Sequence, residues 1–234
     1  MLDKYKRQVI AETVTRGLDP NVPMKDSRER WIGAIPRSWQ VVPLRALLRR
    51  TSKKGRPDLR LLSVERERGV VDRLTDGSAD NHNRVPDDLR DYKVVRNGQF
   101  VMNKMKAWQG SYGVSAADGI VSPAYYVFDL AVPVPSFFNW AIRSAAYIGY
   151  FGRDSYGIRT DQWDFKPNAL KSIPFAMPPE NEQREIVSFL EMRVSAINEL
   201  VADIDRQIGL LETYRKQLIS DVVTGKVRVS EDAA

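Results

Sequence analysis

The sequence lacks the residues and segments on which several classes of protein depend. It contains no cysteine and a single histidine, His82, among 234 residues. Disulfide frameworks and thiolate metal sites are therefore excluded, and a zinc site is disfavoured. No apolar run approaches the roughly 20 residues that a membrane-spanning helix needs, and the N-terminal residues lack the apolar core of a secretion signal. We therefore expect a cytoplasmic protein with no membrane partner.

Sequence motifs of catalysis are also missing. The chain has no Gly-rich phosphate loop, no Asn/Asp-Pro-Pro-aromatic motif of adenine methyltransferases, and no acidic pair followed by lysine as in nucleases. Asp154, Asp161 and Asp164 are close in sequence, but a loop of mixed charge accounts for them. We expect a chain that is not an enzyme by itself and holds no cofactor.

Basic residues are concentrated in the middle of the chain. Residues 41–175 contain 21 Lys or Arg against 14 Asp or Glu, whereas residues 176–234 contain 7 against 11. A polyanion is attracted to the middle and repelled by the tail, which favours nucleic acid as the partner of one part and protein as the partner of the other. Ordinary surface charge with no partner is the alternative explanation.

The basic middle, residues 41–175, has the pattern of a mixed α and β domain. Asn97-Gly98 and Asp118-Gly119 are typical of two-residue hairpin turns, and each lies between two strand-like segments. We therefore expect two β-hairpins in this domain. The expected strands are residues 59–64, 92–95, 99–102, 113–115 and 120–130, and the expected helix is residues 136–148.

A long amphipathic helix is the clearest pattern in the sequence. Apolar residues recur in alternating steps of four and three from Leu190 to Val222, and only Arg215 interrupts them. Such a heptad seam is typical of a coiled coil. From about Glu182 to Val222 the helix would measure ~60 Å at ~1.5 Å per residue, and Gly225 supplies a stop. The seam residues expected at an interface are Leu190, Val194, Ile197, Val201, Ile204, Ile208, Leu211 and Leu218.

The apolar seam must be covered, because most helical stability in proteins comes from packing an apolar face. One alternative is that the helix folds back over residues 41–175. A domain of that size is ~30–35 Å across, so a rod of ~60 Å extends beyond it. Part of the seam must then meet another helix, and we expect association between two copies or with another half subunit.

The N-terminal residues repeat the end of this helix. Residues 5–15 (YKRQVIAETVT) match residues 214–224 (YRKQLISDVVT) with five of eleven positions identical. A helix end with no helix before it indicates one unit of a duplicated design. Chance similarity between two amphipathic helix ends is the alternative.

Three further stretches form a recognisable set. They are WIGAIP at residues 31–36 with Trp39, then NKMKAWQGS at 103–111 followed by GIVSPAYY at 119–126, and finally LKSIP at 170–174 with PPENEQ at 178–183 and the closing Thr224-Gly225. Through them the chain resembles the specificity subunit of type I restriction–modification (R-M) systems, over nearly its whole length. The third stretch, a long helix with a proline lead-in, is the most specific.

This resemblance implies an α+β fold, with a globular target recognition domain followed by a long C-terminal coiled-coil helix. It implies double-stranded DNA as ligand, and modification (methyltransferase) subunits and restriction subunits as partners. S-adenosylmethionine and ATP would be bound by those partner subunits. Members of the family generally carry two recognition domains and two spacer helices, whereas this sequence has one of each plus a helix end. It is either a natural half-length subunit that pairs with itself or the second half of a longer chain.

Basic, aromatic and amide side chains are the candidate DNA contacts. Lys and Arg can hold phosphates, Arg pairs with guanine, and Gln or Asn pairs with adenine in the major groove. Core packing is the alternative for Trp108 and Trp163, and a solvated charge run is the alternative for residues 49–56. The candidates are Lys53, Lys54, Arg56, Lys104, Lys106, Gln109, Ser111, Tyr112, Arg153, Tyr156, Arg159 and Gln162.

Pairing of two long helices in antiparallel orientation would hold two recognition domains at opposite ends of a rod. Such a dimer would read a bipartite, palindromic site. A coiled-coil adaptor whose basic domain binds protein or RNA is the alternative function. The expected divisions are residues 1–17 (helical repeat), 18–176 (recognition domain), 177–226 (dimerising helix) and 227–234 (tail).

Overall fold

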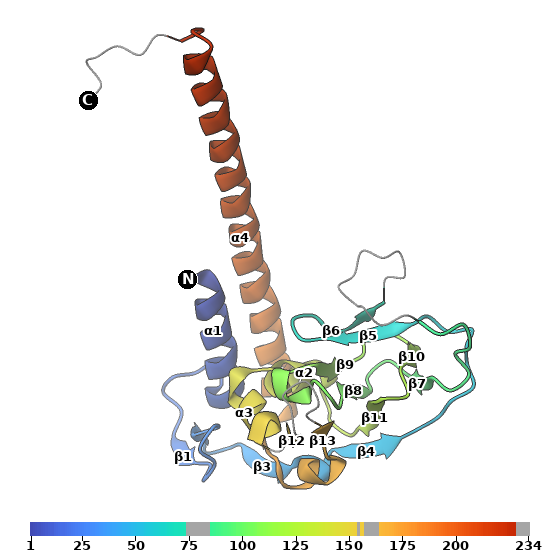
Figure 1. Cartoon of the computed structure of the whole chain (residues 1–234). Coiled ribbons are helices and arrows are strands. Elements are labelled where there is room, and N and C mark those ends of the chain that lie inside the picture. The colour runs from blue at the N-terminus through green and yellow to red at the C-terminus, as the bar shows by residue number, and fades with distance from the viewer. Residues whose placement is uncertain (74–84, 154, 157–163, 228–234) are drawn as a thin grey trace.

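A single long helix projects from a mixed α and β domain (Figure 1). The computed structural model describes residues 1–73, 85–153, 155–156 and 164–227. The predicted α+β class with a long C-terminal helix is confirmed. The elements are α1 (Leu2–Arg16), β1 (Met24–Asp26), β2 (Ala34–Pro36), β3 (Gln40–Pro43), η1 (Leu44–Ala46), β4 (Leu48–Thr51), β5 (Leu62–Glu65), β6 (Gly69–Asp72), β7 (Lys93–Val95), β8 (Phe100–Asn103), η2 (Ala107–Gln109), β9 (Tyr112–Val114), β10 (Gly119–Val121), β11 (Tyr125–Leu130), α2 (Pro135–Ile142), α3 (Ala145–Arg153), β12 (Ser155–Tyr156), β13 (Asp164–Phe165), η4 (Pro167–Ser172), β14 (Pro174–Met177) and α4 (Glu180–Val223).

A four-stranded antiparallel sheet in the order β4-β11-β8-β9 forms the centre of the domain. Its register places Phe128 of β11 opposite Phe100 of β8, and Val127 opposite Val101. Because successive side chains of a strand point to opposite faces, the phenylalanines line one face and the valines the other. The phenylalanines belong to the main core and the valines to a smaller apolar cluster. Both faces are therefore covered, and exposed charges lie on the edge strand β4.

Both predicted hairpins are wrong, although strands form near the predicted positions. Strand β7 pairs with β10, and β8 pairs with β9 and β11, so Asn97-Gly98 joins strands of two different sheets. Asp118-Gly119 likewise lies between β9 and β10, which belong to different sheets. The backbone N–H of Asn97 donates to the Asp118 carboxylate at 2.8 Å, so the two turns contact each other. A turn sequence sets local geometry, whereas burial of apolar faces decides which strands pair.

Two short helices, α2 and α3, pack on the phenylalanine face. The sequence predicts one helix over residues 136–148, but the structure interrupts it at Arg143 and Ser144. The Arg143 guanidinium donates to two backbone carbonyls of the β5–β6 turn, at 3.2 and 2.6 Å. The interruption lets both helices direct aromatic rings into one core, where Phe138 and Phe175 lie with ring centres 5.0 Å apart.

The start of α4 is fixed to the N-terminal part of the domain. Strand β14 pairs with β3, and Pro178-Pro179 then lead into α4. The fully buried Trp39 donates from Nε1 to Glu182 Oε2 at 2.9 Å. Burial raises the pKa of Glu182 above its ordinary value, even though the hydrogen bond from Trp39 acts in the opposite direction. This joint sets the direction in which α4 leaves the domain.

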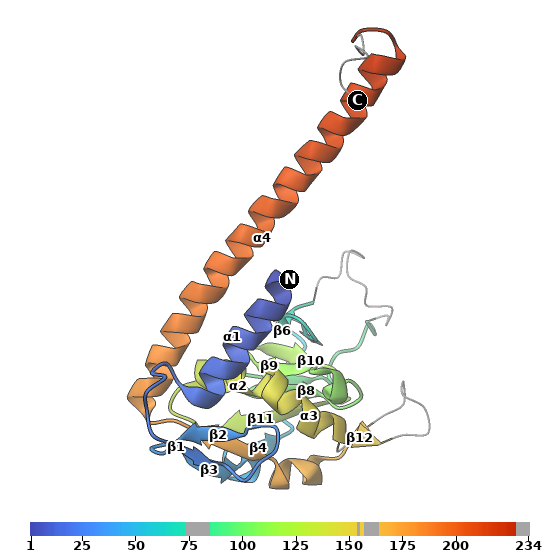
Figure 2. The ribbon, with the colours of Figure 1, turned by 90° about the vertical axis from the view of Figure 1, so that its left-hand side faces the viewer.

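Helix α1 lies antiparallel beside the first half of α4 (Figures 1 and 2). Near the start of α1, Arg193 of α4 donates to the Tyr5 hydroxyl at 2.8 Å. After its end, Gly17 comes so close to α4 that a Cβ there would lie 2.7 Å from Glu182 Oε1. The predicted span of the long helix agrees with the observed 44 residues to within two positions at its start and one at its end. Its second half extends without a neighbour in the described structure (Figure 2).

Candidate nucleic-acid interface

Basic side chains gather around Lys93 and Tyr126 near the β4 edge of the central sheet. Arg50 belongs to β4 and Lys54 follows it, while Lys93 begins β7 and Lys104 follows β8. The Arg50 guanidinium lies 4.6 Å from the centre of the Tyr126 ring, and Lys93 Nζ lies 5.8 Å from it. Arg50 is paired with the residue two positions after Tyr126 on β11, which places both side chains on the same face of the sheet. We call these four cations with Tyr126 the basic cluster.

Lys93 is the buried member of the basic cluster. Its side chain donates to the backbone carbonyls of Pro123 at 2.6 Å and Tyr125 at 2.5 Å. Burial lowers the pKa of Lys93, and the positive charges of Arg50, Lys54 and Lys104 lower it further. Like charges held this close oppose one another, so an anion bound beside them relieves an electrostatic cost. The phosphates of a nucleic-acid backbone can supply that charge.

The loop between β8 and β9 presents cations on one side and is buried on the other. Lys106 is exposed and Lys104 is partly exposed. Ser111 and Tyr112, which the sequence predicts as DNA contacts, are instead buried in the domain. The chain turns inward at Gly110, with φ 90°, and the Tyr112 ring packs 4.3 Å from a core phenylalanine. Burial also raises the pKa of Tyr112. These two predicted contacts are wrong because the end of the loop starts a core strand.

The second predicted basic segment adjoins this loop. The backbone N–H of Phe165 in β13 donates to the Lys104 carbonyl at 3.0 Å, and β13 pairs with β12, which contains Tyr156. Arg153, at the end of α3, is exposed, with its guanidinium 5.8 Å from the Trp31 ring. The backbones of the two predicted segments are therefore neighbours. Arg159, Gln162 and Trp163 lie outside the described residues.

The three predicted DNA contacts in the loop after β4 differ in whether they already pair with a carboxylate. Lys54 forms an exposed ion pair with Asp91 at 3.0 Å. Arg56 binds both carboxylate oxygens of Asp58, at 2.8 and 2.6 Å, and this pairing raises the pKa of Arg56. The Lys53 ammonium makes no hydrogen bond or ion pair within the described ranges, although its charge helps to lower the pKa of Asp129. Its ammonium is therefore the least committed of the three.

Gln109 faces a different region from the basic cluster. It lines a pocket of about 750 Å³ between α1, α4 and the α2–α3 turn. Charged side chains from α1, including Asp3 and Arg7, line the same pocket. The structure therefore does not bring Gln109 together with the other predicted contacts.

The chain itself covers the first part of the apolar seam. Leu190 is fully buried in the main core, contrary to its predicted place in a dimer interface. Ile197 is buried, and Val194 lines the pocket beside α1. The later seam residues have no such cover. Val201 is partly exposed, and Ile204, Ile208, Leu211 and Leu218 are exposed.

Arg50, Lys93 and Tyr126 have a place in the basic cluster that the sequence did not predict. Lys93 stands at the start of an apolar strand, and a lysine in that position is the signal that could have identified it. No sequence signal indicated that Tyr126 would lie beneath Arg50, because that contact depends on the pairing of β4 with β11.

Two solved structures are similar to this chain. One is a chain from a structure that addresses complex assembly and conformational transition of the type I R-M system, with 15% identity, a TM-score of 0.59, and coverage of 94% of this chain and 51% of that one. The fold is that of a type I R-M chain. The other is the HsdS subunit from Thermoanaerobacter tengcongensis, with 15% identity, a TM-score of 0.47, and coverage of 88% and 45%. The chain thus spans about half the length of the type I R-M chains it matches.

The type I R-M fold agrees with the resemblance drawn from the sequence. No family model and no curated protein matches the sequence. Within the described ranges, no group of three or more His, Asp or Glu side chains could hold a metal ion. No helix of that part of the chain combines the length and apolarity needed to cross a membrane.

Proposed function

We propose that this chain is the DNA-recognition (specificity) subunit of a type I R-M complex and is not itself an enzyme. The observation that carries the proposal is the basic cluster, which gathers four cations around Lys93 and Tyr126 on a domain with the type I R-M fold. The cations bind phosphates and set the position of the domain on the duplex. Side chains of the adjoining loops then read base edges in the major groove.

A second copy of this chain is the proposed partner of the exposed half of α4. The seam positions are symmetric about Arg206: reflection through it exchanges Ile204 with Ile208 and Val201 with Leu211. Two antiparallel α4 helices with a two-fold axis near Arg206 therefore bring apolar residues together along the seam, except that Ile197 faces Arg215. The two recognition domains then lie at opposite ends of the rod and read the two halves of a palindromic site.

Partner subunits supply the chemistry in this proposal. The exposed carboxylates on the outer face of α4 are available to modification subunits, which bind S-adenosylmethionine. Restriction subunits use ATP, and the complex acts in the cytoplasm. The carboxylates concerned are Glu191, Glu199, Asp203 and Asp205.

Mapping of methylated adenines across the genome, with and without this gene, tests the proposal. We expect one bipartite motif to lose methylation when the gene is absent. The complex with the modification subunit should also protect that motif in DNA footprinting. Charge reversal by Lys104→Glu with Lys106→Glu should weaken the protection, whereas Lys4→Glu with Lys216→Glu, on the helices, should not. Unchanged methylation, or binding of RNA in preference to duplex DNA, would overturn the proposal.

A further inference from the structure

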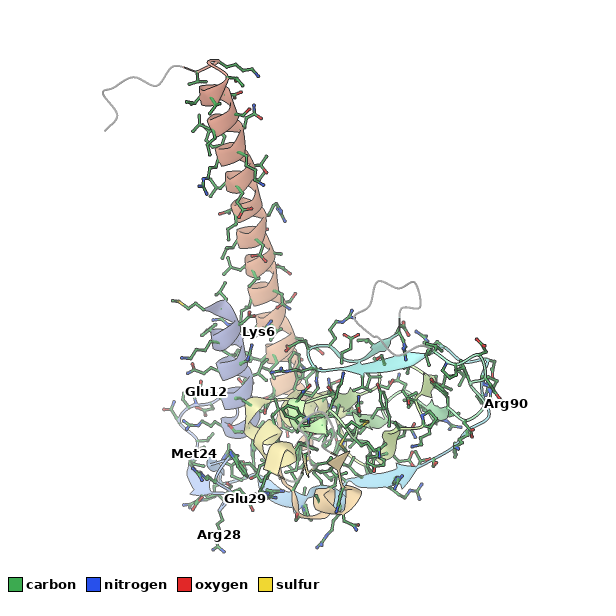
Figure 3. All side chains as sticks on the ribbon, in the orientation of Figure 1. Lys6, Glu12, Met24, Arg28, Glu29 and Arg90 are labelled. Carbon is green, nitrogen blue, oxygen red and sulfur yellow. The ribbon has the colours of Figure 1, made fainter. Side chains whose placement is uncertain are left out.

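Helix α1 is held on α4 by polar contacts. Residues 214–224, which repeat residues 5–15 of α1, carry side chains able to make the same contacts. Arg193 donates to the Tyr5 hydroxyl at 2.8 Å. Lys6, which is labelled between α1 and α4 in Figure 3, donates to Asn198 Oδ1 at 3.1 Å. The Arg193 guanidinium also lies 5.8 Å from the centre of the Tyr5 ring. Apolar residues at the end of α1, such as Val14, are buried in the domain. The first half of α4 thus carries a site for one specific helical segment.

The end of α4 carries the same set of side chains. Tyr214 and Arg215 occupy the repeat positions of Tyr5 and Lys6, and Leu218 occupies that of Val9. In α1 the tyrosine and the lysine make the contacts with α4, whereas Tyr214 is 67% exposed. Residues 214–224 therefore have the chemistry of the segment that fills the site, but lie too far along α4 to reach it in their own chain.

Antiparallel pairing about Arg206 would bring this segment to that site in a second copy. With the axis there, residue 214 of one copy faces residue 198 of the other, and residue 222 faces residue 190. In the structure, Tyr5 contacts residue 193 and Lys6 contacts residue 198. These pairings agree with those of the dimer to within about one and a half turns of helix, at 3.6 residues per turn. One site on α4 thus matches two segments in nearly the same register.

Arg215, the one interruption of the apolar seam, supports this register. Its repeat equivalent, Lys6, finds a hydrogen-bond acceptor in Asn198. Paired about Arg206, Arg215 lies opposite Ile197 of the second copy, and Asn198, the acceptor that Lys6 uses, is the next residue.

We propose that α1 occupies, in the single chain, the site that residues 214–224 of a second copy fill in the dimer. This inference rests on the antiparallel pairing proposed above. Because two segments cannot occupy one site, α1 is an intramolecular competitor of dimerisation. Because both copies of a two-fold dimer must release α1, the apparent dissociation constant equals the intrinsic constant divided by the square of the fraction of chains in which α1 has left the site. Weakening α1 should therefore strengthen the dimer.

Cysteine crosslinking tests the position of the segment, since the chain has no cysteine of its own. We expect a short bismaleimide to join copies that carry Arg193→Cys with Tyr214→Cys into dimers. Within one helix these positions are 21 residues, or ~32 Å, apart, so a bond inside one chain is excluded. The matched control, Arg193→Cys with Tyr5→Cys, should crosslink within single chains.

A helix-breaking substitution tests the competition. Gln8 is exposed on α1, and Gln8→Pro should unwind the first turns, since proline removes a helical hydrogen bond and clashes with the preceding turn. Gln8→Ala keeps the helix and serves as the control. We expect Gln8→Pro, but not Gln8→Ala, to lower the dimer dissociation constant at least tenfold in sedimentation and to raise the yield of the Arg193–Tyr214 crosslink.

Two outcomes would overturn the inference and differ in what they say of the proposed function. In the first, Gln8→Pro chains form dimers no better than wild type and give no crosslink between positions 193 and 214. The helices would then pair in a register that leaves α1 in place, which would refute the competition but not the dimer. Chains that remain monomers with Gln8→Pro would remove the pairing itself. In either case, the methylation map remains the separate test of DNA recognition.

Discussion

The salt dependence of DNA binding gives the sharpest test of the basic interface. Lys53 and Lys106 are the residues to change, because both are exposed and neither ammonium makes a hydrogen bond or ion pair within the described ranges. Each ammonium is therefore able to neutralise a phosphate, whereas Lys54 and Arg56 already form ion pairs with carboxylates. We expect Lys53→Ala with Lys106→Ala to weaken binding to random-sequence duplex DNA by the complex with modification subunits.

The size of the effect follows from counterion release. Each phosphate contact contributes about 0.9 to the slope of log affinity against log salt concentration. The proposed complex holds two copies of the chain, so the double variant removes four contacts and should lower the magnitude of that slope by about 3.6. The ratio of wild-type to variant affinity should therefore shrink about 150-fold when salt rises fourfold, from about 50 to about 200 mM. Fluorescence anisotropy titrations at four salt concentrations would measure it.

An equal loss of charge elsewhere is the control for this salt experiment. Lys4→Ala with Lys216→Ala removes two cations from the helices, away from the basic cluster, and should leave the slope unchanged. If the double variant at Lys53 and Lys106 kept the wild-type slope, these lysines would release no counterions. The assignment of the β4 and β8–β9 loops to the DNA interface would then be refuted.

Three further predictions concern the helix, its joint and the core. Ile208→Lys should leave only monomers at micromolar concentration in light scattering, while Met192→Lys, at an exposed position off the seam, should not; equal masses would contradict the seam. Because the pKa of Glu182 is raised, its contribution to the free energy of unfolding is present below the ordinary glutamate pKa of ~4.3 and is lost as pH rises through the pKa of the folded state. In thermal melts, Glu182→Gln should therefore become more stable relative to wild type as pH rises from 4 to 7. A stability difference that does not change with pH would argue against the raised pKa of Glu182. Gly119→Ala should destabilise the domain by about 1–3 kcal/mol, since its Cβ would lie 2.6 Å from a Leu62 carbon. Gly209→Ala, in open space on α4, should instead stabilise the protein by about 1 kcal/mol. Urea titrations of both glycine variants would measure these changes, and changes of the same sign would refute the packing argument.

Local patterns in the sequence predicted the parts of the fold that local patterns determine. The span of α4 follows from a seam repeated over many turns and a proline pair before its first residue. The repeat at residues 5–15 identified α1 as a helix, and the structure has a helix there. Strand positions were also close, because apolar runs between turn residues mark strands whatever their partners. The exception is residues 120–130, which form the two strands β10 and β11 in different sheets.

The pairing of strands that are distant in the chain could not be predicted from the sequence. The pair Asn97-Gly98 was expected to close a hairpin, but β7 pairs with β10, whereas β8 pairs with β9 and β11. These pairings bury apolar side chains in the two clusters on either side of the central sheet. The same cause explains the candidate site. Tyr112 follows a basic loop and reads as a surface residue, yet its pairing with Met102 on β8 places its ring in the core. Lys93 joins the basic cluster only through the fold.

The joint between Trp39 and Glu182 makes α4 a lever. At ~1.5 Å per residue, its 44 residues reach ~66 Å from the joint. A tilt of about 5° at the base would move the far end by about 6 Å, close to two base-pair steps of ~3.4 Å. Helix α1 limits such tilting, because it supports α4 from the first turn as far as Asn198. A substitution at the Trp39–Glu182 contact that tilts α4 would therefore displace the far end of the helix more than any other part of it.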